Sequence, residues 1–216
     1  TGIGGGTGSY SYGIYTRDAA LDSGAGTMTL DGTGASGAEG LYFDSSTVIG
    51  GHYDDNSILT APQSGNINLI ADGSGPSSIA IVDWACEGYC PLVIQGTGTL
   101  TLRPFNDASS IGLAGGFGDF NLDSTALGFI QPGFSNIVIG NVAGTGLISV
   151  GDSDFGSGWT VPGSANLTLQ SPGAGSGGIA VDGPLATGGK LTLNTAGAIN
   201  ASAGLTAIGD VTLTGG

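Results

Sequence analysis

The sequence predicts an all-β protein built as a parallel β-solenoid, in which short strands stack coil upon coil. Three observations predict this class. Glycine supplies 45 of the 216 residues, whereas Asp, Glu, Lys and Arg together make up only 9%. Short runs in which Leu and Thr alternate recur along the chain, which is the period-2 pattern of a strand with one buried face. The C-terminal part repeats with a period of about 20 residues, a length that fits one coil of such a stack.

Residues 1–104 are predicted to form longer, irregular coils. Gly, Ser, Asn or Asp flanks each alternating run and supplies the turns. The periodicity fails in residues 44–63 and 83–91, so we expect these two segments to be loops that project from the coils. The alternating runs in this part are Thr27–Leu30, Asn66–Ile70 and Thr99–Leu102.

Internal matches predict how these irregular coils stack. The segment Met28–Gly34 matches Leu69–Gly75, so that position 28 aligns with position 69, and Leu92–Gly98 then repeats the pattern from position 92. Near the start, Tyr12–Tyr15 (Tyr-Gly-Ile-Tyr) corresponds to Gly40–Tyr42 (Gly-Leu-Tyr), because each follows a Gly-Thr-Gly unit. We expect matching positions to lie above one another, about 4.8 Å apart.

Residues 105–165 are predicted to be middle coils, and residues 166–216 are predicted to be regular coils of about 20 residues. One constant offset aligns Ile179 with Ile199, Leu185 with Leu205, Gly189 with Gly209, Leu191 with Val211, and Leu193 with Leu213. One coil earlier, the step from Leu167 to Leu191 is slightly larger, because the turn between them is longer.

At roughly 22 residues per coil, residues 1–216 would form a single domain of about ten coils with loop insertions. Neither end shows a polar cap, and the last alternating run, Val211–Thr214, reaches the end of the sequence. Solenoid ends need capping to avoid edge-to-edge association. We therefore expect uncapped ends, further coils in the natural protein, and self-association end to end or side to side.

The charge balance excludes two classes of partner. With 3 basic against 17 acidic residues, the net charge is −14, and the chain cannot neutralise a row of phosphates. Nucleic-acid binding is therefore not expected. Attraction to an anionic membrane fails for the same reason. No stretch approaches the ~18 apolar residues of a membrane-spanning helix, so membrane insertion is not expected either.

Cys86 and Cys90 lie close together in a segment bounded by Gly and Pro, and a disulfide between them is predicted. The alternative is a metal or redox pair, although the only His, His52, is far away in the sequence. A disulfide favours an extracellular or periplasmic compartment. Trp84 and Tyr89, in the same segment, are candidates for contact with a partner or a sugar ring, or for packing on the solenoid.

Asp54 and Asp55 are the candidate acids of an alternative function. Neighbouring carboxylates beside His52 and Tyr53 could share a proton, as in a polysaccharide lyase or hydrolase. Such enzymes hold anionic glycans with basic residues, which this chain almost lacks. We therefore expect a solvated loop there, no catalytic residues, no metal site and no cofactor.

The repeats resemble those of filamentous-haemagglutinin-type proteins, the large secreted β-helical adhesins of Gram-negative bacteria. The resemblance covers most of the chain and rests on the order of several short motifs. These are Gly6–Gly8 with Tyr12–Tyr15, Leu102–Pro104, Ile111–Gly115, Leu127, Gln131–Gly140, Asn166–Leu169, Lys190–Leu193 and Asp210–Leu213.

The resemblance implies a right-handed parallel β-helix at the bacterial cell surface or in the extracellular space. It also implies a structural or adhesive role, as a rigid rod or fibre-forming unit in surface or biofilm adhesion. Partners would then be other copies of the chain, or a host or matrix glycan or protein. The family carries no catalytic residues in these repeats. The amino-terminal secretion domain of such proteins is missing from this sequence, so the export route stays open.

Overall fold

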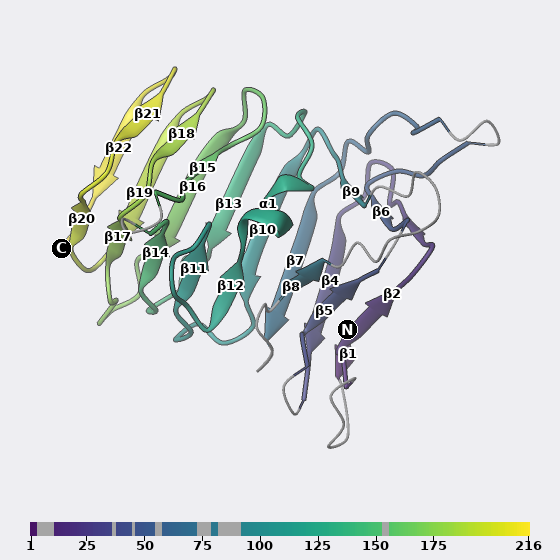
Figure 1. Cartoon of the computed structure of the whole chain (residues 1–216), viewed down its shortest axis with the longest axis horizontal. Coiled ribbons are helices and arrows are strands. Elements are labelled where there is room, and N and C mark those ends of the chain that lie inside the picture. The colour runs from purple at the N-terminus through teal and green to yellow at the C-terminus, as the bar shows by residue number, and fades with distance from the viewer. Residues whose placement is uncertain are drawn as a thin grey trace.

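The computed structural model describes residues 1–3, 11–35, 38–44, 46–54, 58–72, 79–81, 92–152 and 156–216. Strands take up 45% of the chain and helix 3%, and every strand pair in the named sheets is parallel. The predicted all-β class with parallel strands is confirmed. Figure 1 shows the strands side by side along the long axis of the molecule, from the N-terminal to the C-terminal end.

One sheet runs the length of the molecule and contains eight strands, β1-β4-β7-β10-β13-β16-β19-β22. Every third strand of the chain joins it. Its strands are β1 (Gly2–Ile3), β4 (Met28–Thr33), β7 (Ile67–Asp72), β10 (Thr99–Pro104), β13 (Asn136–Gly140), β16 (Asn166–Ser171), β19 (Leu191–Thr195) and β22 (Val211–Thr214).

The other strands form shorter sheets, two toward each end of the molecule. Near the N-terminus these are β2 (Ile14–Thr16), β5 (Leu41–Phe43) and β8 (Ile79–Ile81), and beside them β3 (Ala20–Leu21), β6 (Val48–Ile49) and β9 (Val93–Ile94). Toward the C-terminus they are β12 (Phe120–Leu122), β11 (Ile111–Leu113), β14 (Ile148–Val150), β17 (Ile179–Val181) and β20 (Ile199–Ala201), and then β15 (Trp159–Thr160), β18 (Leu185–Thr187) and β21 (Leu205–Ala207).

The alternating sequence pattern explains the core. In the long sheet, one face of each strand carries aliphatic residues that lie in register with those of its neighbours. These residues form two buried columns, each at most 2% exposed, and burial of this apolar area is the main stabilising contribution. The columns are Ile67-Leu100-Ile137-Leu167-Leu191 and Leu69-Leu102-Ile139-Leu169-Leu193.

The opposite face of the long sheet carries stacked polar side chains. Asn136 Nδ2 donates to Thr99 Oγ1 (3.4 Å), and Asn166 Nδ2 donates to Asn136 Oδ1 (3.0 Å). Asn166 Oδ1 in turn accepts the backbone N–H of Lys190 (2.9 Å). Each of these hydrogen bonds joins one repeat to the next, so these polar groups are paired within the stack of strands.

The C-terminal registers agree with the sequence. Ile179 pairs with Ile199, Leu185 with Leu205 and Leu191 with Val211, all at the constant offset that the repeat predicts. Leu167 pairs with Leu191, which is the expected larger step. Near the other end, the expected match of Tyr15 with Tyr42 is also confirmed, since these two residues pair between β2 and β5.

Two N-terminal alignments were wrong. Met28 pairs with Ile67 instead of Leu69, so Leu69 stacks on Leu30. Leu69 pairs with Leu102, whereas the segment expected to continue the column contains β9, whose Val93 pairs with Val48 in another sheet. The predicted alignments matched turns of the Asp-Gly-Thr-Gly type at the ends of these strands. They therefore assigned the wrong partners to the buried residues.

The long sheet contains eight strands among the described residues, whereas about ten coils were expected. The steps from Met28 to Ile67 and from Ile67 to Leu100 are both much longer than the last step, from Leu191 to Val211. The N-terminal part therefore contributes fewer strands to the long sheet from the same length of chain.

The expected loop over residues 44–63 is interrupted by a core strand. Val48 and Ile49, which form β6, are at most 1% exposed, so the projecting part of this segment begins after them. Residues 83–91 lie outside the described residues. An unexpected helix, α1 (Ser124–Gly128), occupies the middle region, and Asp123 caps it by accepting the N–H of Ala126 (2.8 Å).

The two ends of the long sheet differ in burial from its centre. Among the described strands, β22 pairs with β19 alone and β1 with β4 alone. Val211 and Leu213 of β22 are 47% and 53% exposed, whereas their partners Leu191 and Leu193 are fully buried. The apolar column therefore reaches solvent at β22.

Candidate functional site

Four of the residues singled out from the sequence lie outside the described residues. They are Trp84, Cys86, Tyr89 and Cys90. The disulfide and the partner-contact role of this segment stay predictions. Asp55, one of the two candidate acids, also lies outside the described residues.

The other candidate acid, Asp54, closes a local turn. Its Oδ1 accepts the backbone N–H of Ile58 (2.9 Å), and its own N–H donates to the Ile58 carbonyl (2.9 Å). Tyr53 and Leu59 form an antiparallel bridge beside it. These bonds give Asp54 a structural part in the segment that carries His52 and Tyr53.

His52 and Tyr53 line a shallow surface hollow of about 270 Å³. The hollow lies where strands β3 and β6 pair, because Ala20 and Val48 are register partners and both contribute to its surface. Its complete lining is Asp18, Ala19, Ala20, Ser46, Val48, His52 and Tyr53. His52 and Tyr53, the sequence neighbours of the candidate acids, thus line the same hollow as Asp18, a carboxylate from a distant part of the chain.

Two residues of this hollow have a left-handed backbone. Asp18 has φ of 49° and Ser46 has φ of 58°, and the only other such non-glycine residue in the described part of the chain is Ala114. Asp18 and Ser46 occupy equivalent corners of neighbouring coils, since each stands two residues before a member of the Ala20–Val48 pair. The same corner conformation is thus repeated one strand apart, with a polar side chain each time.

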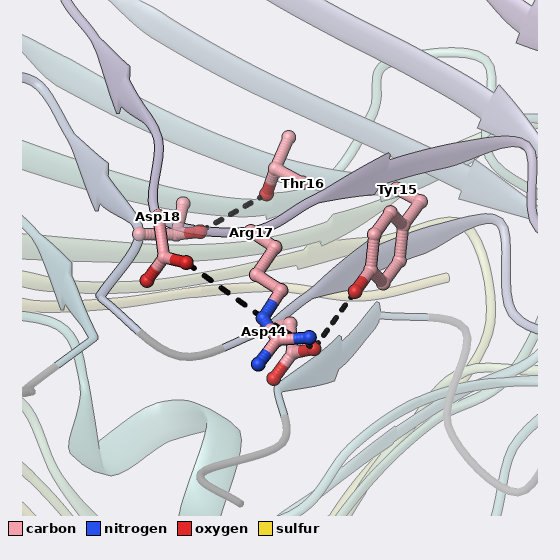
Figure 2. A network of polar contacts seen from close by, with 6 residues as sticks. Tyr15, Thr16, Arg17, Asp18 and Asp44 are labelled. Carbon is pink, nitrogen blue, oxygen red and sulfur yellow. Dashed lines mark hydrogen bonds and ion pairs between the residues drawn. The ribbon is translucent and has the colours of Figure 1, made fainter. Parts of the chain in front are cut away.

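A polar network extends from Asp18, one of the residues that line the hollow, to Tyr15 (Figure 2). The Arg17 Nε lies 3.7 Å from Asp18 Oδ2 and 3.9 Å from Asp44 Oδ2. The hydroxyl of Tyr15 donates to the same Asp44 oxygen at 2.8 Å. Asp44 is the inner member of this network, with a side chain only 13% exposed, against 63% for Arg17 and 68% for Asp18.

The hydrogen bond to Asp44 raises the pKa of Tyr15. A phenol that donates to a carboxylate loses that bond, and gains a like charge, when it ionises. The hydrogen bond to Asp44 is accordingly the main reason that the pKa of Tyr15 lies above its ordinary value of 10.0, with desolvation and the Asp44 charge adding to it. Tyr15 therefore stays a hydrogen-bond donor throughout the neutral pH range.

Tyr15 belongs to a stack of three tyrosines on the outer face of β2 and β5. The Tyr12 and Tyr42 ring centroids lie 4.2 Å apart, and those of Tyr15 and Tyr42 lie 5.6 Å apart. The third pair, Tyr12 and Tyr15, is 5.9 Å apart with planes only 16° from parallel. Tyr15 is 49% exposed, so the stack presents an aromatic edge to solvent.

A second, smaller hollow of about 230 Å³ lies beside α1. It contains no charged side chain: its lining is Ser124, Leu127, Gly128, Ile130, Gly158, Trp159, Thr160 and Pro162. Trp159 is 7% exposed and belongs to the core, so its ring packs against the interior and leaves little surface for a ligand. The first hollow has the richer chemistry.

The described residues contain no group of three or more His, Cys, Asp or Glu side chains placed to hold a metal ion. Within the same part of the chain, no helix is long and apolar enough to cross a membrane.

Sequence reasoning did not select Tyr15, Arg17, Asp18 or Asp44 as site residues. The signal for the tyrosine stack was present in the match of Tyr12–Tyr15 with Gly40–Tyr42, which places Tyr15 on Tyr42. Nothing in the sequence pairs Asp18 with Ser46. Their relation depends on the backbone conformation at each of the two corners and on the number of residues between one strand and the next.

No protein-family model, characterised protein or solved structure matches this chain. The resemblance to filamentous-haemagglutinin-type repeats therefore stays a prediction, based on the motifs quoted above.

Proposed function

We propose that the chain is a right-handed parallel β-helix and serves as a structural and adhesive segment of a secreted bacterial surface protein. It would act outside the cell as a rigid rod or a fibre-forming unit in surface or biofilm adhesion, without catalysis. Its partners would be further copies of itself, or a glycan or protein of the host or matrix.

The observation that carries this proposal is the eight-stranded parallel sheet with its in-register columns. From β13 onward the chain visits the five-stranded sheet, then a three-stranded sheet, then the long sheet again, three times in succession. This order is what a three-sided coil produces. At ~4.8 Å per strand, the eight strands extend for about 34 Å along the stacking direction.

One further feature supports a structural role. The buried columns consist of aliphatic side chains, as in a structural core.

Small-angle X-ray scattering and electron microscopy test the rod. We expect an elongated particle whose long axis follows the strand-stacking direction, and filaments with the same axis at high protein concentration. A compact particle would contradict the rod, and a strictly monomeric one at high concentration would contradict the fibre-forming unit. Display of the chain on a non-adherent bacterium tests adhesion, because we expect it to increase retention on glycan- or matrix-coated surfaces.

Release of reducing sugar ends from neutral and acidic polysaccharides tests for the alternative, a carbohydrate-active enzyme. We expect no release. Release that disappears in a double variant Asp54→Asn, Asp55→Asn would overturn the non-catalytic part of the proposal.

A further inference from the structure

We propose that the hollow formed by Asp18, Ser46, His52 and Tyr53 binds one sugar unit of an uncharged glycan. This inference rests on the adhesive role proposed above and names its ligand class. Asp54, one of the two acids considered for catalysis, is not among the residues that line this hollow.

The corner conformation is the first argument. A left-handed backbone disfavours side chains with a Cβ, and glycine adopts it without that cost. Elsewhere in the described chain this conformation falls mostly to glycine, for example Gly50, Gly140 and Gly178. At two equivalent corners around one hollow the sequence instead has Asp18 and Ser46. Asp tolerates this backbone better than most residues with a Cβ, but Ser does not, and the two corners together bring a carboxylate and a hydroxyl to the same hollow.

The lining chemistry is the second argument. Ala19, Ala20 and Val48 supply an apolar floor, and an acid, an imidazole, a hydroxyl and a phenol stand around it. A pyranose ring has the complementary arrangement, with C–H groups on its faces and hydroxyl groups at its edge. The Asp18 carboxylate can accept hydrogen bonds from the hydroxyl groups, and Tyr53 adds an aromatic side chain to the lining, of the kind that packs against C–H groups.

The volume of the hollow limits how much of a ligand it can hold. Pockets that bury drug-sized molecules have volumes of about 300–1,000 Å³. A shallow hollow of about 270 Å³ is therefore suited to a single ring, with the rest of the glycan extending over the surface.

Charge selects a neutral sugar. Arg17 is the one cation of the adjoining network and already lies within 4 Å of two carboxylates, Asp18 and Asp44. The whole chain has a net charge of −14. An anionic sugar would meet Asp18 without a cation in excess, and its approach is opposed by the field of the protein.

The neighbouring network leaves Asp18 open to a ligand. Asp44 receives the Tyr15 hydroxyl and lies beside Arg17, and Arg17 lies beside Asp18 (Figure 2). Asp18 stands at the end of this network and is 68% exposed, so its carboxylate can accept hydrogen bonds from a ligand.

Calorimetric titration of the whole chain with lactose, cellobiose, α1,2-mannobiose and N,N′-diacetylchitobiose tests the site. We expect saturable binding of at least one of these neutral disaccharides, and weaker binding of digalacturonate and choline. Asp18→Gly and Ser46→Gly should each weaken that binding at least about tenfold, because each removes a hydrogen-bonding group. Their melting temperatures should equal or exceed that of the wild type, because glycine suits these corners.

Asp18→Asn provides a second variant that keeps a residue tolerant of the left-handed backbone and removes only the charge. It should also weaken binding. Asp210→Asn is the matched control: it neutralises another exposed acid, paired with Lys190 at 3.3 Å in the C-terminal part, and should leave binding unchanged.

Three outcomes overturn the site. They are no saturable binding of any of the four neutral disaccharides, tighter binding of digalacturonate or choline, and binding that the variants at positions 18 and 46 do not weaken. The proposed function is judged separately, by the shape of the particle and by adhesion on display. A rod that still adheres while the sugar titrations fail would refute the site alone.

Discussion

The two ends of the molecule differ in the length of chain that separates successive strands of the long sheet. In the regular stack, residues 166–216, one pass along the long sheet leads from Leu167 to Leu191 and the next from Leu191 to Val211. In the N-terminal flank, residues 11–54, the pass from β4 to β7 leads from Met28 to Ile67 and is far longer. The additional residues do not enlarge the long-sheet strands, since β7 and β16 both contain six residues. They lengthen the corners and loops.

The polar side chains also differ between these two regions. In the regular stack the polar groups repeat and satisfy one another, as Asn166 does with Asn136 and Lys190. In the N-terminal flank Arg17, Asp18 and Asp44 do not recur from strand to strand, and together with Tyr15 they form one local network. The comparison teaches that repeated side chains build the long sheet, whereas side chains that do not repeat supply the local surface chemistry.

The largest effect is expected where the buried column is interrupted. Leu167→Ala removes a fully buried side chain between Ile137 and Leu191, and should lower the free energy of unfolding by about 3–5 kcal/mol. Urea denaturation measures it. The control Thr168→Ala, one residue further on the outer face, should change stability by less than about 0.5 kcal/mol. Similar losses for both variants would contradict the inward and outward assignment.

A close approach between strands should give the next largest effect. Gly140 has φ of 85°, and a Cβ there would overlap the Gln170 carbonyl oxygen of the neighbouring strand. Gly140→Ala should therefore cost about 2–3 kcal/mol, from backbone strain and the steric overlap together. Gly175→Ala is the matched control, because Gly175 has φ of 83° but open space around it. A smaller loss for Gly140→Ala than for Gly175→Ala in thermal denaturation would refute the close approach.

The polar ladder should contribute less than either. Asn166→Ala removes one donor to Asn136 and one acceptor of the Lys190 N–H, and should cost about 1–2 kcal/mol. Asn200→Ala, at an exposed position of β20, serves as the control and should be close to neutral. Equal effects in urea denaturation would show that the ladder does not stabilise the stack.

The smallest effect concerns the pH dependence of the N-terminal flank. The folded pKa of Tyr15 is raised, so its contribution to stability is fully present below the unfolded pKa of about 10 and is lost as pH rises through the folded value. Asp44→Asn should lower the folded pKa of Tyr15 toward its ordinary value. NMR titration of ¹³Cζ-labelled tyrosine measures this, with Tyr53 as an internal reference. An unchanged Tyr15 titration would contradict the hydrogen bond.

The sequence predicted the parts of the fold in which one pattern repeats without insertions. Leu167, Leu191 and Val211 could be aligned because the strand and both turns recur together. The alignment of Met28 was wrong by two residues, a shift that keeps the same face inward and is therefore invisible to a period-2 pattern. A strand as short as β6, and α1 with its single turn capped by Asp123, carry too few residues for any periodicity.

The candidate site was less accessible to sequence reasoning than the fold. His52 and Tyr53 were considered as neighbours of the candidate acids Asp54 and Asp55, and both line the hollow. Asp18 was missed because its partner Ser46 is distant in the sequence and is related to it through the Ala20–Val48 register alone. Such a relation depends on how many residues each corner accommodates, which composition and alternation do not specify.

The near-identity of the strands in the regular stack has a consequence for folding. β16, β19 and β22 each contain a Leu-Thr-Leu or Val-Thr-Leu segment, so a slip by a whole coil would return every aliphatic side chain to an inward position. Several arrangements of this half are then close in energy. The unrepeated side chains of the N-terminal flank, such as Arg17 beside Asp18 and Asp44, fit one arrangement only. These side chains therefore define one register, to which the remaining strands can add as the chain folds.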